Sequence, residues 1–162
     1  MVSDEDLAAL EAQLGRPARG VVDVAHRCSC GQPDVVKTAP RLEDGTPFPT
    51  VYYLTCPRAA AAIGTLEADG IMRDMTDALE HDAELSAQYL QAHEQYLEVR
   101  EALGHVEEIA GISAGGMPTR VKCLHVLVAH ALAAGPGVNP LGDQALAMLD
   151  DWGKSGKCGD CS

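Results

Sequence analysis

Segments that favour β-strands and segments that favour helices are separated along this chain, and the change falls at Pro57. Before that residue, β-branched and aromatic runs at 21–24, 35–38 and 50–55 predict short strands joined by turns. After it, alanine-rich and periodic stretches predict helices. We therefore predict an α+β fold, in which a small antiparallel sheet of about three strands packs against about five helices.

The helices have recognisable starts and stops. Ser3 or Asp4 can cap a short N-terminal helix, Pro57 suits a first helical position, and Asn139-Pro140 can open a last helix that runs to about Trp152. The segments 71–82, 83–103 and 119–134 are predicted to be helical as well. In the longest of these, apolar residues recur every three or four positions and form one stripe: Leu85, Tyr89, Ala92, Tyr96, Val99 and Leu103.

Length and composition restrict the classes of function. The 162 residues suit one globular domain over 1–152, followed by a polar tail over 153–162. With 24 acidic against 12 basic side chains, the net charge of −12 argues against a nucleic-acid partner. No apolar run approaches the roughly 18 residues of a membrane span, so we expect no membrane partner. The acidic start lacks the features of a secretory signal, so a cytoplasmic location is expected.

Cysteine and histidine side chains are the main chemical feature. The six cysteines are Cys28, Cys30, Cys56, Cys123, Cys158 and Cys161. In a reducing compartment, such clusters bind metal or do redox chemistry more often than they form disulfides, although some can be ordinary buried thiols. His125 can act together with Cys123 only if the helix that contains it starts at or after Cys123, because two residues subtend about 200° on a regular helix. His130, on an apolar segment, is typical of a hydrogen-bonded core histidine, whereas His81, His93 and His105 lie in the acidic segment and are expected to be exposed.

The predicted metal site is assembled from distant segments. Its ligands are Cys28, Cys56 and Cys123, with His125 or Cys30 as the fourth. Thiolate-rich ligation favours zinc, with an iron–sulfur cluster as the alternative. The tail motif formed by Cys158 and Cys161 has metal-binding spacing, but we interpret it as part of a mobile terminus.

Charge is distributed unevenly around these residues. Residues 67–108 carry 12 acidic and two basic side chains, whereas the blocks on either side are mildly basic. We predict that basic residues near the cysteines either offset thiolate charge or hold a small anionic ligand: Arg27, Arg58, Arg120 and Lys122. The glycine-rich loop 111–118 could likewise cradle an anion or serve as a plain linker.

Three stretches of the sequence resemble a known family. They are HRCSCGQPDVVKTAPRLEDGTPFPTVYYLTCP (26–57), the pair His93-Glu94, and SAGGMPTRVKCLHVLVAHALAAGPGVNPLGD (113–143). Over roughly residues 15–150 the chain resembles a bacterial family known only as domain of unknown function 501. The resemblance implies no established activity.

Three functions are compatible with these observations. The first is a metal-binding protein of unknown activity with a Cys/His site. The second is a metal-dependent enzyme that acts on a small phosphorylated or carboxylated substrate, in which an open zinc position would hold water. The third is an interaction module that uses its acidic helices to bind a basic partner.

Overall fold

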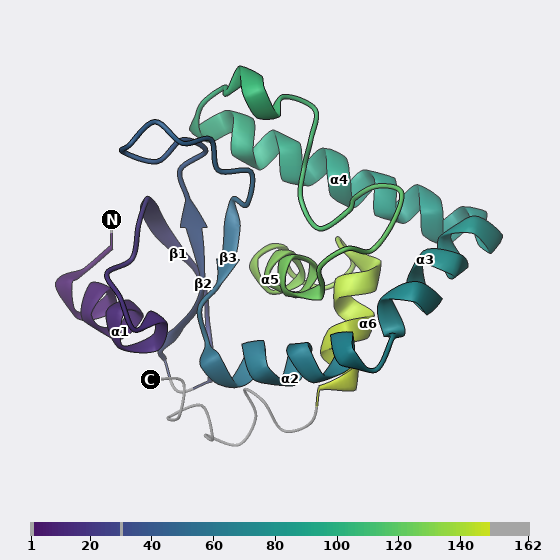
Figure 1. The fold of residues 1–162 in the computed structure, drawn as a ribbon, viewed down its shortest axis with the longest axis horizontal. Coiled ribbons are helices and arrows are strands. Elements are labelled where there is room, and N and C mark those ends of the chain that lie inside the picture. Colours follow the sequence, from purple (N-terminus) through teal and green to yellow (C-terminus); the bar gives the residue numbers. More distant parts are fainter. Residues whose placement is uncertain (1, 30, 150–162) are drawn as a thin grey trace.

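A three-stranded antiparallel sheet and six α-helices build the part of the chain that the structure describes (Figure 1). The structure is a computed structural model that describes residues 2–29 and 31–149. The predicted α+β class is confirmed, with one helix more than the five expected. Cys30, Trp152, Cys158 and Cys161, on which predictions fell, lie outside the described residues.

The strands are β1 (Val21–Arg27), β2 (Pro33–Thr38) and β3 (Tyr52–Leu54). Their order in the sheet is β1-β2-β3, so each strand pairs with its neighbour in sequence. β2 is central and buried on both faces, and Val36 pairs with Tyr53 on one side and with Val24 on the other. β1 is interrupted by register shifts and is the most exposed of the three.

The helices begin close to the predicted caps. They are α1 (Asp4–Leu14), α2 (Pro57–Ala68), α3 (Ile71–His81), α4 (Ala83–Leu103), α5 (Leu124–Ala134) and α6 (Pro140–Met148), with a short 3-10 turn at Glu107–Ile109. The Ser3 hydroxyl accepts the Asp6 N–H, and the Asn139 side chain accepts the Gly142 N–H. No helix in the described residues is both long and apolar enough to cross a membrane.

Helix α5 forms the centre of the core. Figure 1 shows it end-on, between the sheet and the surrounding helices, and it contacts β3, α2 and α6. Its sequence is apolar on nearly every side, which is typical of a helix that is covered all round. Leu124, Leu127 and Val128 are completely buried.

His130 lies in this core as a hydrogen-bonded residue, as predicted. It is fully buried, stacks on Tyr52 at 5.8 Å between ring centroids and meets Tyr96 edge-on at 5.1 Å. One ring nitrogen contacts the Gln95 side-chain oxygen and the other contacts the Asn139 side-chain nitrogen. Burial lowers the pKa of His130 to about 4.

Two predictions in this part of the chain were wrong. α5 begins at Leu124 and not at Thr119, because the preceding residues make non-helical bonds: Lys122 N–H donates to Gly115 O, and Val121 N–H donates to Thr76 Oγ1. His93 was expected to be exposed with the other histidines of the acidic segment. It is half-buried, and its Nδ1 lies 2.7 Å from Ser113 Oγ.

Arg100 is the one basic residue of α4 and is only 4% exposed. Its guanidinium donates to Pro49 O and to Ile109 O, and so it holds two separate loops against the helix. We expect Arg100→Leu to lower the free energy of unfolding by about 2 kcal/mol, because two partly buried carbonyls lose their donors. Arg73→Leu on the exposed side of α3 is the matched control and should change it by less than about 0.5 kcal/mol in urea titrations. Equal stabilities of the two variants would contradict the clamping role.

Candidate metal centre

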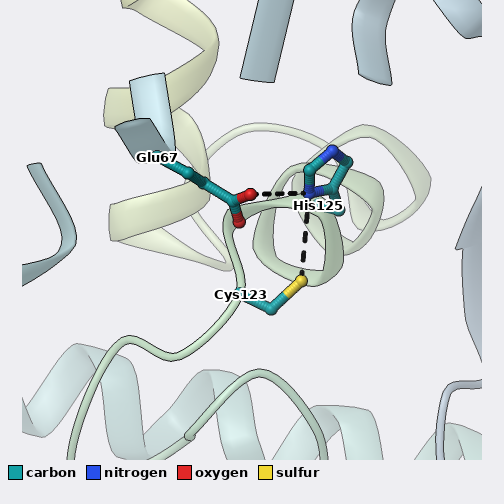
Figure 2. Close-up of side chains that lie close together, drawn as sticks. All are labelled: Glu67, Cys123 and His125. Atoms are coloured by element: carbon teal, nitrogen blue, oxygen red, sulfur yellow. Dashed lines mark hydrogen bonds and ion pairs between the residues drawn. The ribbon is translucent and has the colours of Figure 1, made fainter. Parts of the chain in front are cut away.

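Three side chains that can bind a metal converge where α2 meets the start of α5. They are Glu67, Cys123 and His125, and one ligand atom from each lies within 4.8 Å of the others. Figure 2 shows the Glu67 carboxylate and the Cys123 sulfur both directed at one nitrogen of the His125 ring. That nitrogen, Nδ1, lies 3.3 Å from Glu67 Oε1 and 4.0 Å from Cys123 Sγ.

The local structure explains why Cys123 and His125 meet. Cys123 has an extended backbone and is the N-cap of α5, so the helical turn starts only after it. The condition set by the sequence is therefore met, and the rotation of about 200° that a continuous helix would impose between the two residues does not apply. Both side chains are half-buried beside α2.

The second ring nitrogen of His125 is held by the backbone. Nε2 lies 3.0 Å from the carbonyl oxygen of Ala60, which can only accept a hydrogen bond. The neutral ring therefore carries its proton on Nε2 and presents the lone pair of Nδ1 to Glu67 and Cys123. A histidine that binds a metal through one ring nitrogen usually donates the N–H of its other ring nitrogen to a carboxylate, a backbone carbonyl or water, as His125 does here.

The two carboxylate oxygens of Glu67 have different partners. Oε2 accepts the N–H of Leu124 at 2.9 Å, which satisfies a donor at the first turn of α5. The carboxylate also lies at the positive end of the α5 dipole. Oε1 is the atom that faces His125. The α5 backbone thus holds Oε2, and the ion pair with His125 holds Oε1.

The three groups shift one another's protonation. The hydrogen bond to Cys123 raises the pKa of His125 to about 9 against the effect of burial, and the Ala60 carbonyl and Glu67 add to it. Burial raises the pKa of the Cys123 thiol, but hydrogen bonds from His125 and the Val126 N–H outweigh it, and the net shift is downward. Without a metal, the site therefore favours a thiolate paired with an imidazolium.

Cys123 and His125 also line a cleft of about 370 Å³. Its other walls come from Thr50, from residues 52–54, from Ala60 and from Val126. Two of the three residues of the site thus border a space large enough for a small molecule.

Two other predicted ligands, Cys28 and Cys56, lie elsewhere. Cys28 and Cys56 are buried and pack with Ala59 in a separate cluster at the start of α2. Cys56 is the N-cap of α2, as expected from Pro57. Among the described residues, the group of side chains that could share one ion consists of Glu67, Cys123 and His125, and includes neither of these two cysteines.

The predicted anion-binding residues are dispersed as well. The Arg27 guanidinium pairs with Asp6 at 2.7 Å, and Arg58 is half-buried in the first turn of α2. Arg120 and Lys122 lie together on the loop before α5 and line a different cleft.

Glu67 was not predicted as a metal ligand, because it is one of 12 acidic residues in the segment 67–108 and nothing in its immediate sequence distinguishes it from the others. One signal was present: Ala60 and Glu67 are seven residues apart, so a helix places them on the same side. The sequence did not indicate that this side faces His125.

Comparisons with known proteins place the chain but assign it no activity. A family model described as "Protein of unknown function (DUF501)" matches residues 24–147. No curated protein and no solved structure matches the chain.

Proposed function

The chain belongs to the DUF501 family of unknown function, and we propose that it is a metal-binding protein that holds one zinc ion through Glu67, Cys123 and His125. The observation that carries this proposal is that one ligand atom each of Glu67, Cys123 and His125 lies within 4.8 Å of the others, so one ion can reach all three. The Ala60 carbonyl supports it by holding Nε2, which leaves Nδ1 facing Glu67 and Cys123.

The distances suit tetrahedral zinc. With bonds of about 2.0–2.3 Å, tetrahedral angles separate a nitrogen and an oxygen ligand by about 3.4 Å, and a nitrogen and a sulfur ligand by about 3.6 Å. The observed separations are 3.3 Å from Nδ1 to Oε1 and 4.0 Å from Nδ1 to Sγ. A shift of a few tenths of an ångström at Cys123 would complete the geometry.

The donor set also favours zinc among the common metals. One thiolate, one imidazole and one carboxylate are all ordinary zinc ligands, whereas magnesium prefers oxygen ligands alone. An iron–sulfur cluster requires several thiolates. Cys123 is the only thiolate donor of this group among the residues that the structure describes.

The test is metal binding by the full chain after treatment with a chelator. We expect one equivalent of zinc to bind. Cobalt(II), used as a probe, should give the charge-transfer band of a sulfur–cobalt bond. Cys123→Ser should abolish that band, and His125→Gln and Glu67→Gln should weaken zinc binding by more than about a hundredfold, since loss of an outer-shell partner alone costs tenfold to a hundredfold.

Cys28→Ser and Cys56→Ser are the matched controls, and both should retain the ion and the cobalt band. Circular dichroism of each variant separates loss of a ligand from loss of folding. Zinc should also slow alkylation of Cys123, which peptide mass mapping can follow at this single thiol. Equal zinc affinity in wild type and Cys123→Ser, or loss of the ion in Cys56→Ser alone, would overturn the assignment.

A metal-dependent enzyme is the second candidate, and the cleft beside Cys123 and His125 favours it. Three protein ligands with a fourth position open to a cleft are typical of catalytic zinc sites, where the ion activates water or polarises a carbonyl. The lining of this cleft in the described residues contains no arginine or lysine. It therefore offers an anionic substrate no counter-charge besides the ion itself.

A further inference from the structure

The loop that precedes α5 forms a second cleft, separate from the candidate metal centre. It has a volume of about 400 Å³, and residues 112–117, 119, 120 and 122 line it. The loop contains two glycines with left-handed backbones, Gly115 at φ +68° and Gly116 at φ +93°. Ligand pockets for small molecules begin at roughly 300 Å³, so a phosphate with an attached organic group can fit.

Two cations of this cleft, Arg120 and Lys122, have no carboxylate partner among residues 2–29 and 31–149. Arg19, Arg27 and Arg41 each form an ion pair at 2.7–2.9 Å. Arg120 and Lys122 are both exposed, and within the part of the chain that the structure describes neither side chain makes a hydrogen bond or an ion pair. Two neighbouring positive charges left unpaired in a chain of net charge −12 form a local site for an anion.

Gly116 brings these two side chains together. A Cβ at this position would lie 3.0 Å from Arg120 Cγ and 3.0 Å from Lys122 Cβ. The first carbons of both side chains therefore lie beside the glycine, which has no side chain to keep them apart. Both residues line the same cleft.

The cleft is also held in place before any ligand arrives. Tyr89 Oη donates to the carbonyl oxygen of Arg120 at 2.9 Å, and Thr76 Oγ1 accepts the Val121 N–H at 3.0 Å. At the other end of the loop, the buried Ser113 hydroxyl is bonded to His93 of α4 at 2.7 Å. Preorganisation of this kind reduces the entropy lost when a ligand binds.

From these observations we propose that the cleft of residues 112–122 binds a phosphate group, carried by a small phosphate monoester or as inorganic phosphate. The Arg120 guanidinium can donate two parallel hydrogen bonds to a phosphate, and the Lys122 ammonium adds a second positive charge. The Thr119 hydroxyl, on the cleft wall between them and the glycines, is a further donor.

This site is independent of the proposed zinc site. Burial alternates along the segment that joins them: Arg120 and Lys122 are exposed, Val121 is buried and Cys123 is half-buried. The two cations therefore face one cleft while Cys123 faces the other. Loss of zinc binding in Cys123→Ser should leave phosphate binding intact, so failure of one proposal is distinguishable from failure of the other.

The experiment is calorimetric titration of the full chain with inorganic phosphate and, separately, with glycerol 3-phosphate, at constant ionic strength. We expect saturable binding of at least one of them, weakened by more than about tenfold in Arg120→Gln/Lys122→Gln because two charge-assisted contacts are lost. Tighter binding of the monoester identifies the ester as the ligand class, and equal binding identifies phosphate itself.

Arg73→Gln/Lys37→Gln removes the same charge from cations outside this cleft and should bind as wild type does. Gly116→Ala keeps both charges, but its Cβ would lie 2.7 Å from the carbonyl oxygen of Arg120 at a φ of +93°, so it should distort the turn and weaken binding as well. Far-UV circular dichroism checks that each variant is folded. The proposal is overturned if neither ligand saturates, if chloride at the same ionic strength competes equally, or if both double variants bind as wild type does.

Discussion

Replacing Gly142 by alanine lowers the free energy of unfolding by about 3 kcal/mol, near the upper end of the usual cost of overpacking a core. An alanine Cβ here would overlap the carbonyl oxygen of Leu127 and would lie 2.9 Å from the Cβ of Ala131. Both atoms belong to α5, and a backbone oxygen cannot rotate away as the end of a long side chain can. α6 must therefore move away from α5, which loosens the contacts of the fully buried Leu141 and Ala145.

Gly64→Ala in α2 is the matched control. No atom lies within 4 Å of a Cβ built at this position, so the same substitution meets no obstacle. Alanine should raise stability by up to about 1 kcal/mol through its higher helix propensity. Urea unfolding measures the free energy of unfolding of each variant. In thermal unfolding, the two variants should differ in melting temperature by roughly 8–16 °C. A Gly142→Ala protein as stable as Gly64→Ala would show that α5 and α6 do not approach so closely.

Protonation of His130 destabilises the fold as the pH falls below about 6.5. The orientation of Asn139 explains why: its oxygen accepts the Gly142 N–H, so its nitrogen must point at His130. Because that nitrogen can only donate, His130 Nδ1 must accept, and the proton of the neutral ring lies on Nε2, toward Gln95. A protonated ring would place two donors face to face in a fully buried position.

The direction and the size of this effect of pH on stability follow from the pKa of His130. The folded-state pKa is lowered to about 4 from an ordinary value of 6.5, so the unfolded chain binds the proton more readily between these values. Stability from His130 is therefore complete above pH 6.5 and is lost as the pH falls toward 4, by about 2.5 kcal/mol at pH 4.5.

Other groups also titrate between pH 7.5 and pH 4.5, so the effect of His130 is measured as the difference between wild type and a variant that lacks this histidine. Free energies of unfolding are compared at pH 7.5 and pH 4.5 in wild type and in His130→Gln, whose amide keeps one donor and one acceptor. We expect wild type to lose about 2.5 kcal/mol more than the variant between these pH values. Equal losses would mean that His130 is not held neutral by its surroundings.

The local features of this protein were predictable from the sequence, because they depend on hydrogen bonds and side-chain preferences within a few residues. The three strands, the caps at Ser3 and Asn139 and the start of α2 at Pro57 belong to this group. The burial of His130 followed from the apolar residues around it in sequence. The pairing of Cys123 with His125 was stated as a condition on where a helix begins, and the structure meets that condition.

Contacts between distant segments depended on the tertiary structure. Glu67 completes the candidate metal centre only because α2 packs across the first turn of α5, 57 residues away. Arg100 lies between two loops whose carbonyls it satisfies, and both loops are distant from it in sequence or separated by a turn, so its neighbours in sequence did not indicate this role. The segment 119–123 was predicted to be helical, yet side chains from α3 and α4 bond to its backbone groups and it is not helical. Local propensity is worth less than 1 kcal/mol per residue, so a few long-range hydrogen bonds and the burial of one more side chain are enough to outweigh it.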